Sequence, residues 1–266
     1  MKKLNYYDNI AQIYDQTRWL TESVAEEVAD FVLELSCATA ETSFLEPGVG
    51  RGLNVLPLVK RGYWVTGIDI SEEMLDQFRQ KLEETPPNLK LIHSDASQLP
   101  FPDNSFDVVL TVHMIHAVSD WRAFLNEIDR VIKPKGFYLN CQWITPPARR
   151  EFEGYLRAIL FKYEGSEQES KRINAAIQEI DVEEYFRCKG YASNYFVAKE
   201  WTVNNTIEEL LDFFKSRAYG LCWQVSDETF HQVMKEFEEF CVNHYGSLKK
   251  ILSSKAKFEI WAYRTV

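Results

Sequence analysis

Three acidic side chains follow three successive apolar segments, and a glycine-rich turn follows the first of them. Glu46 precedes the run Pro-Gly-Val-Gly-Arg-Gly (47–52), and Asp69 and Asp95 close the next two segments. Alternating glycines permit positive φ and let a ligand approach the backbone, and the helix beyond offers free N–H groups. Carboxylates can pair with an ammonium group and accept hydrogen bonds from ribose hydroxyls or an adenine amino group. The pattern predicts a site for a ligand that carries an amine, a ribose and an adenine.

The segments that must position these acids alternate between strands and helices. Apolar runs predict strands at 42–48, 63–69, 89–95, 106–114 and 137–144. Helical spacing and caps predict helices at 22–35, at 53–61, after Ser71, and after Ser119 or Asp120. Strands joined through helices run parallel with right-handed crossovers, and ligands bind at their carboxyl ends. We therefore expect a doubly wound α/β sheet, with an α+β fold of antiparallel pairs as the alternative.

The pattern changes after Pro146 and Pro147. Helical stretches are expected from Phe152 to Tyr163, near 170–186, from the capping box Thr206/Glu209 to Arg217, and at 227–244, with strands at 195–203 and 258–266. We interpret the late strands as completion of the sheet and the helices as a lid.

Composition and charge exclude several classes of function. The 266 residues carry a formal charge of −10, which disfavours a nucleic-acid partner because phosphate binding needs clustered cations. The most apolar stretch, 106–118, is shorter than the roughly 20 residues that a membrane span needs. The lysines near the start precede no apolar segment, so we expect no secretory signal. Five scattered cysteines without a CxxC pair indicate reduced thiols in the cytoplasm and no zinc site.

The chain resembles the class I S-adenosylmethionine-dependent methyltransferases, in particular their small-molecule (type 11) branch. The matching segments are YDNIAQIYDQTR (7–18), LEPGVGRG (45–52), GIDIS (67–71), HSDASQLPFPDNSFDVVLTVHMIHAV (93–118) and FLNEIDRVIKPKGF (124–137). The resemblance implies a Rossmann-like seven-stranded sheet in the order 3-2-1-4-5-7-6 with strand 7 antiparallel. It also implies S-adenosylmethionine as cofactor and S-adenosylhomocysteine as product. Arg51 departs from the family, in which a small residue or Thr is commoner at this position.

The resemblance assigns contacts with each part of the cofactor. The residues implied are Tyr14 and Arg18 on an amino-terminal flap, Glu46 and Gly48 at the methionine part, Gly50 as a further cofactor-binding residue of the turn, Asp69 at the ribose, Ile70, Met74, Asp95 and Ala96 at the adenine, and Val112 and His113 at the methionine part and the transferred methyl group.

Two histidines are candidates for a catalytic base. His113 and His116 follow the fourth predicted strand, and a histidine near neutrality can remove a proton from an acceptor. Packing or simple surface exposure is the alternative for both. Their His-x-x-His spacing lacks a third ligand, so we expect no metal.

The expected reaction is in-line displacement of a methyl group onto an O, N or C atom of a small, apolar or aromatic metabolite. Alignment and exclusion of water would do most of the catalysis. The sequence contains no Asn/Asp-Pro-Pro-Tyr motif near the fourth strand and no Pro-Cys pair, which weighs against nucleic-acid substrates. The alternatives are an NAD(P)-dependent oxidoreductase, which the GxGxG spacing disfavours against GxGxxG, and a non-catalytic cofactor-binding protein. We expect a cytoplasmic monomer or homodimer without a membrane partner.

We expect a single methyltransferase domain over residues 1–266. Its parts would be a helical flap at 1–40, a cofactor-binding core at 42–145, a helical acceptor lid at 146–194, and sheet-completing strands and helices at 195–266.

Overall fold

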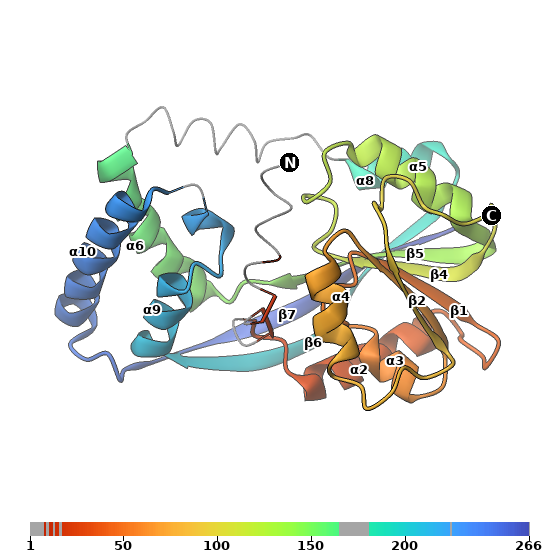
Figure 1. Ribbon diagram of the computed structural model, residues 1–266. Coiled ribbons are helices and arrows are strands. Elements are labelled where there is room, and N and C mark those ends of the chain that lie inside the picture. Colours follow the sequence, from red (N-terminus) through yellow and green to blue (C-terminus); the bar gives the residue numbers. More distant parts are fainter. Residues whose placement is uncertain are drawn as a thin grey trace. The chain divides into compact units, whose positions relative to one another are not determined.

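The computed structural model describes residues 8, 11, 12, 14, 15, 18–164, 181–223 and 225–265. The main elements are α2 (Glu22–Leu35), β1 (Ser43–Pro47), α3 (Leu56–Lys60), β2 (Trp64–Asp69), α4 (Glu72–Arg79), β3 (Leu89–His93), β4 (Phe106–Val112), α5 (Trp121–Val131), β5 (Ile132–Ile144), α6 (Pro147–Glu164), α8 (Val182–Cys188), β6 (Ala192–Thr206), α9 (Ile207–Lys215), α10 (Asp227–Tyr245) and β7 (Ile251–Arg264). All of them except β3 are labelled in Figure 1.

The strands form one seven-stranded sheet in the order β3-β2-β1-β4-β5-β7-β6 (Figure 1). β1 pairs in parallel with β2 and β4, β2 with β3, and β4 with β5, whereas β7 runs antiparallel to β5. Parallel neighbours follow from the helical crossovers between them. The doubly wound sheet and its strand order are therefore confirmed, and the α+β alternative is wrong.

Helix starts coincide with the capping residues that the sequence indicates. The side chain of Ser71 accepts a hydrogen bond from Met74 N at the start of α4. Thr206 and Glu209 form the reciprocal capping box of α9. At α5 the cap is Asp120, one of the two candidates. These caps matter for function because α4 and α5 begin just beyond the carboxyl ends of β2 and β4.

The chain divides into two compact units. The first comprises residues 1–144, 180–199 and 257–266, and the second comprises 145–179 and 200–256.

Each unit has a hydrophobic core of its own. In the first, buried side chains of α5, α8 and the central strands cluster together, among them Phe124, Leu125, Ile128, Val109, Tyr138, Phe186 and Tyr263. In the second, α6, α9 and α10 contribute the cluster that includes Phe152, Leu156, Leu210, Phe214, Val233 and Phe237. Within each cluster the removal of apolar surface from water is the main stabilising term.

The segments expected at 146–194 and 195–266 cross the boundaries of these units. Residues 165–180, which hold most of the helical stretch expected near 170–186, lie outside the described residues. The described end of that stretch is α8. The expected single domain thus contains two compact units, and the role of 146–194 as an acceptor lid stays a prediction.

The described part of the chain was searched for membrane-spanning helices, metal sites and disulfide bonds. None of its helices is long and apolar enough to cross a membrane. Within the same residues, no three His, Cys, Asp or Glu side chains come together as a metal site would require. All five cysteines are free, and Cys37 and Cys188 are exposed.

The cap of α5 gives a direct test of how this helix is held. Asp120 Oδ1 accepts hydrogen bonds from the backbone N–H groups of Arg122 and Ala123, each at 3.0 Å. We expect Asp120→Ala to lower the free energy of unfolding by about 1 kcal/mol, because both amides lose their partner. Urea denaturation measures the change. Asp120→Ser should retain most of the stability, and equal midpoints for Asp120→Ala and wild type would contradict the assignment.

Candidate functional site

The glycine turn after β1 is fixed to β2 on one side and open on another. The backbone N–H of Gly48 donates to the carbonyl oxygen of Ile68 at 2.7 Å. Gly52 has a φ of +73°, and a Cβ there would lie 2.2 Å from the Phe78 ring. Gly50 has a φ of +52°, yet a Cβ there would meet nothing within 4 Å. The turn therefore packs tightly against α4 at Gly52 and presents bare backbone to open space at Gly50.

Asp69, at the end of β2, joins the turn to the start of α4. Its Oδ2 accepts from Gly50 N at 2.7 Å, and its Oδ1 accepts from Ser71 N at 2.9 Å. Burial raises the pKa of Asp69, and the hydrogen bonds from Ser71 and Gly50 oppose that rise. Each carboxylate oxygen has a further lone pair, so Asp69 can still accept from a ligand's hydroxyl groups.

Glu46, in β1, is completely buried. Its Oε1 accepts a hydrogen bond from Asn54 Nδ2 at 2.9 Å, whereas its Oε2 has no hydrogen-bond partner among the residues that the structure describes. Burial raises the pKa of Glu46 well above its ordinary value; Asn54 opposes the rise and the nearby Asp69 adds to it. A buried carboxyl with a bare oxygen is costly, and a cationic or hydrogen-bond-donating ligand would relieve that cost.

The segment after β3 carries the third acid. Asp95 is exposed, and its Oδ1 accepts from Ser97 N at 2.8 Å. Ala96, beside it, is buried. Between the tips of β2 and β3, Ile70 exposes 39% of its surface, while Met74 is buried in α4. An exposed apolar side chain next to acidic strand ends provides a surface for a flat ring.

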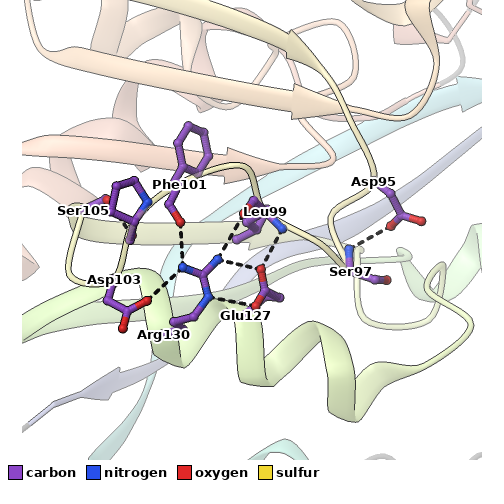
Figure 2. Close-up of polar contacts among 9 residues, drawn as sticks. Asp95, Ser97, Leu99, Phe101, Asp103, Ser105, Glu127 and Arg130 are labelled. Atoms are coloured by element: carbon purple, nitrogen blue, oxygen red, sulfur yellow. Dashed lines mark hydrogen bonds and ion pairs between the residues drawn. The ribbon is translucent and has the colours of Figure 1, made fainter.

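Two charged residues of α5 hold the loop that continues from Asp95 (Figure 2). Arg130 donates to the carbonyl oxygens of Phe101 at 2.6 Å and Leu99 at 3.1 Å. Glu127 accepts from Leu99 N at 2.7 Å and pairs with Arg130, which holds the pKa of Glu127 below its ordinary value. Because the loop's backbone groups are bonded to a helix, its course past Asp95 is fixed.

The tip of β4 presents His113 in an unusual backbone conformation. His113 has a φ of +55°, and its Nε2 lies 3.1 Å from both the backbone N and the carbonyl O of Trp143. Burial lowers the pKa of His113 to about 4, and Arg18 contributes to this shift. The ring is therefore neutral at pH 7, with its Nε2 occupied by the backbone of β5. Val112 is half-buried beside it, and His116 is exposed.

The amino-terminal segment lies against the glycine turn through Arg51. The guanidinium donates to the carbonyl oxygen of Gln12 at 3.0 Å and lies 3.6 Å from the Asp15 carboxylate. Lys81 follows the end of α4, and its Nζ lies 2.5 Å from the same Asp15 carboxylate. The Lys81 ammonium group also donates a hydrogen bond to the carbonyl oxygen of Arg51 at 2.7 Å. The arginine that departs from the family pattern thus holds the amino-terminal segment beside the turn.

The same segment also reaches the end of β5. The Arg18 guanidinium lies 4.1 Å from the centre of the Tyr14 ring. Trp19 packs edge-on against Trp143 with ring centres 6.4 Å apart. Tyr14 and Arg18 therefore lie in a segment that contacts both the glycine turn and the tip of β5.

The expected site residues fall into a connected group and a looser one. Gly50 and Asp69 are hydrogen-bonded, and Asp69 acts electrostatically on Glu46. Asp95 and His116 are exposed, and within the described part of the chain neither is hydrogen-bonded to Gly50, Asp69 or Glu46. Asn54, which binds Glu46, was missed from the sequence, since only the folded β-α turn brings the two together.

Comparison with known proteins identifies the family. A family model described as a methyltransferase domain matches residues 45–140. A demethylmenaquinone methyltransferase from Clavibacter sepedonicus is 30% identical over 199 residues, which cover 70% of this chain and 81% of that relative.

Two solved structures show the same fold at low sequence identity. Phosphoethanolamine N-methyltransferase 2 from Haemonchus contortus, in complex with phosphomonomethylethanolamine and S-adenosylhomocysteine, aligns with a TM-score of 0.57 at 15% identity, over 99% of this chain and 58% of that one. The YcgJ protein from Bacillus subtilis aligns with a TM-score of 0.55 at 17% identity, over 90% of this chain and 97% of that one. Since the Clavibacter relative is matched over most of its length, this chain belongs to the class I S-adenosylmethionine-dependent methyltransferases and is an enzyme of that family.

Proposed function

We propose that the enzyme moves the methyl group of S-adenosylmethionine onto an O, N or C atom of a small, neutral, largely apolar or aromatic acceptor by in-line displacement. The observation that carries this proposal is the fully buried Glu46, whose Oε2 lacks a partner in the described part of the chain, near a glycine turn that is open at Gly50. Membership of the methyltransferase family sets aside the nicotinamide oxidoreductase and the non-catalytic binding protein.

The residues around Glu46 fit the methionine part of the cofactor. Its free oxygen would accept from the ammonium group, and the open backbone at Gly50 would let the carboxylate and sulfonium approach closely. At Gly48 a Cβ would lie 2.5 Å from Met114 Sδ, so this glycine is needed for packing against Met114. When bound, the sulfonium makes the methyl group electrophilic. The residues of this chain then have to bind, orient and exclude water.

The adenosine part fits the ends of β2 and β3. Asp69 is held by Gly50 and Ser71 and would accept from the ribose hydroxyls with its remaining lone pairs. The exposed face of Ile70 would pack on the adenine, and Asp95 would accept from its amino group. Met74 and Ala96 are buried and would support that surface from beneath.

Two observations support the proposed class of acceptor, namely the name of one relative and the net charge of this chain. The Clavibacter relative is named demethylmenaquinone methyltransferase, and its acceptor is by that name a quinone. The net charge of −10 also disfavours an anionic acceptor. We therefore propose a neutral ring with hydroxyl or carbonyl groups. We further propose that the enzyme works in the cytoplasm, where its two exposed free cysteines would stay reduced.

Binding of S-adenosylhomocysteine tests the cofactor site. We expect calorimetry to show binding to wild type and about 10- to 100-fold weaker binding to Asp69→Asn, because the neutral amide loses charge-assisted hydrogen bonds to the ribose. NADH serves as the control ligand and should not bind. Wild type that binds NADH but not S-adenosylhomocysteine would contradict the proposal, and a melting curve of Asp69→Asn checks that the turn is intact.

Glu46→Gln tests the buried carboxyl in the free enzyme. The raised pKa means that the folded protein holds this proton more tightly than the unfolded chain does, so stability is lost as pH rises through the raised pKa. Glutamine cannot ionise. We expect the free energy of unfolding of Glu46→Gln to fall less than that of wild type between about pH 5 and pH 8. Parallel slopes for the two proteins would show that Glu46 does not titrate in this range.

Cofactor binding should favour the ionised form of the Glu46 carboxyl, whereas burial favours its protonated form in the free enzyme. An ammonium group favours the carboxylate, so binding to wild type should release a proton, which calorimetry in buffers of different ionisation enthalpy detects. Glu46→Gln should release fewer protons and bind S-adenosylhomocysteine about 10- to 100-fold more weakly. Identical proton release by both proteins would place the ammonium group elsewhere.

The pH dependence of turnover tests His113 as a base. Its pKa of about 4 makes it neutral from about pH 5 upward. We expect His113 to contribute no rising limb to kcat between about pH 5 and pH 8, so wild type and His113→Asn should have profiles of the same shape. Activity is measured with labelled methyl donor. A rising limb that disappears in His113→Asn would show that His113 titrates during catalysis; His116→Gln is the matched control.

A further inference from the structure

Three charged side chains lie beside the glycine turn and take no part in the cofactor contacts proposed above. The Nζ of Lys81 lies 2.5 Å from the Asp15 carboxylate and donates to the carbonyl oxygen of Arg51 at 2.7 Å. The guanidinium of Arg51 lies 3.6 Å from the same carboxylate. The side chains of Arg51, Lys81 and Asp15 are only 13%, 22% and 23% exposed. Water and salt therefore screen these charges less than they screen a fully exposed ion pair.

Lys81 acts on the backbone of the turn itself. The peptide group between Arg51 and Gly52 is bonded on both sides, because the N–H of Gly52 donates to a carbonyl oxygen within the turn at 2.9 Å and the carbonyl oxygen of Arg51 accepts from Lys81. The preceding residue, Gly50, has a φ of +52° and donates its N–H to Asp69. Glycine restricts the backbone little. The conformation at Gly50 is therefore set from one side by Asp69 and from the other by Lys81.

The partner of Lys81 belongs to the amino-terminal segment. Asp15 contacts Lys81 just beyond the end of α4, and Asp8 accepts a hydrogen bond from Ser71 Oγ at 2.6 Å at the start of that helix. The backbone N–H of Ser71 is in turn held by Asp69. Two acids of the amino-terminal segment thus bond to residues at the two ends of α4, and each of those residues is next to a different part of the expected cofactor site.

Two atoms of the charged group have no hydrogen-bond partner among the described residues. Both Arg51 Nε and Asp15 Oδ1 are buried in this state. The 3.6 Å between Arg51 Nε and Asp15 Oδ2 is longer than a hydrogen bond. Buried polar atoms without partners cost free energy. Stability alone therefore does not explain why these charges lie here, and such costs are typical of residues that serve a functional site.

We propose that Lys81 and Asp15 are positioning residues for the cofactor. Lys81 holds the carbonyl oxygen of Arg51, and Asp15 holds Lys81 in place by its charge. Neither residue has to touch the cofactor, since both act through the conformation of the open backbone at Gly50. The amino-terminal segment thereby strengthens cofactor binding. This proposal rests on the proposed function, because it takes the glycine turn as part of the cofactor site.

Binding of S-adenosylhomocysteine to variants of Lys81 tests the proposal by calorimetry. We expect about 3- to 10-fold weaker binding to Lys81→Met, because the turn loses a hydrogen bond from a charged donor. Lys81→Arg keeps a long cationic donor and should restore most of the affinity. The matched control is Lys189→Met, since Lys189 pairs with Asp129 at 2.6 Å and contacts α5 rather than the turn. This control should bind S-adenosylhomocysteine as wild type does.

Asp15→Asn separates positioning from direct attraction of the ligand. S-adenosylhomocysteine carries one ammonium and one carboxylate group. If Lys81 only attracted that carboxylate through space, the loss of the negative charge of Asp15 would tighten binding. Positioning predicts the opposite, about 2- to 5-fold weaker binding, because Lys81 loses its ionic partner. The double variant Lys81→Met/Asp15→Asn should bind no more weakly than Lys81→Met, because both residues act through one contact.

Amide NMR spectra of the free protein distinguish positioning from general support of the fold. The resonances of Gly50 and Gly52 should shift in Lys81→Met and return toward their wild-type positions in Lys81→Arg. The resonances of the second compact unit should stay unchanged in both variants. A lower melting temperature of Lys81→Met together with unchanged affinity for S-adenosylhomocysteine would show that Lys81 only supports the fold, and it would overturn the proposal.

The remaining outcomes distinguish this proposal from the proposed function. If Lys81→Met binds S-adenosylhomocysteine as tightly as wild type, if Asp15→Asn binds it more tightly, or if Lys189→Met weakens binding as much as Lys81→Met does, the positioning roles are wrong and the cofactor site stands. If wild type binds no S-adenosylhomocysteine, the proposed function fails and this proposal fails with it.

Discussion

The hydrogen bond from the Gly50 amide to the Asp69 carboxylate sets the geometry of the site. At 2.7 Å it ties the turn after β1 to the end of β2, and the second oxygen of Asp69 holds the start of α4. A bare turn with positive φ would otherwise sample many conformations. One side chain thus orders the backbone around the cofactor and still has lone pairs for a ribose, so its binding role and its structural role are inseparable.

A buried polar group lowers the stability of the free enzyme. Glu46 is completely buried, and among the described residues its second carboxyl oxygen has no hydrogen-bond partner. An apolar residue would pack at this position at lower cost. Sites that give up stability in this way are common where a ligand must be recognised. The unpartnered oxygen of Glu46 is therefore the feature of the free enzyme that cofactor binding would explain.

Local pattern predicted the elements, and only the resemblance predicted their order. Apolar runs and caps such as Asp120 located strands and helices because both signals lie within a few residues of each other. The place of β7 between β5 and β6 depends on pairing between distant segments, which periodicity does not encode. Asn54 and the contacts of Arg51 escaped prediction for the same reason: their partners are brought near only by the fold.

The sequence of β5 shows how one strand divides its side chains between the two faces of the sheet. In FYLNCQWI (137–144), the polar residues Asn140 and Gln142 interrupt an otherwise apolar strand at a spacing of two. In a central strand both faces are covered, so polar residues that share one face need partners there. Cys141 and Trp143 face the cofactor side. The pleat therefore directs Cys141 and Trp143 toward the cofactor residues and directs Asn140 and Gln142 toward the opposite face of the sheet.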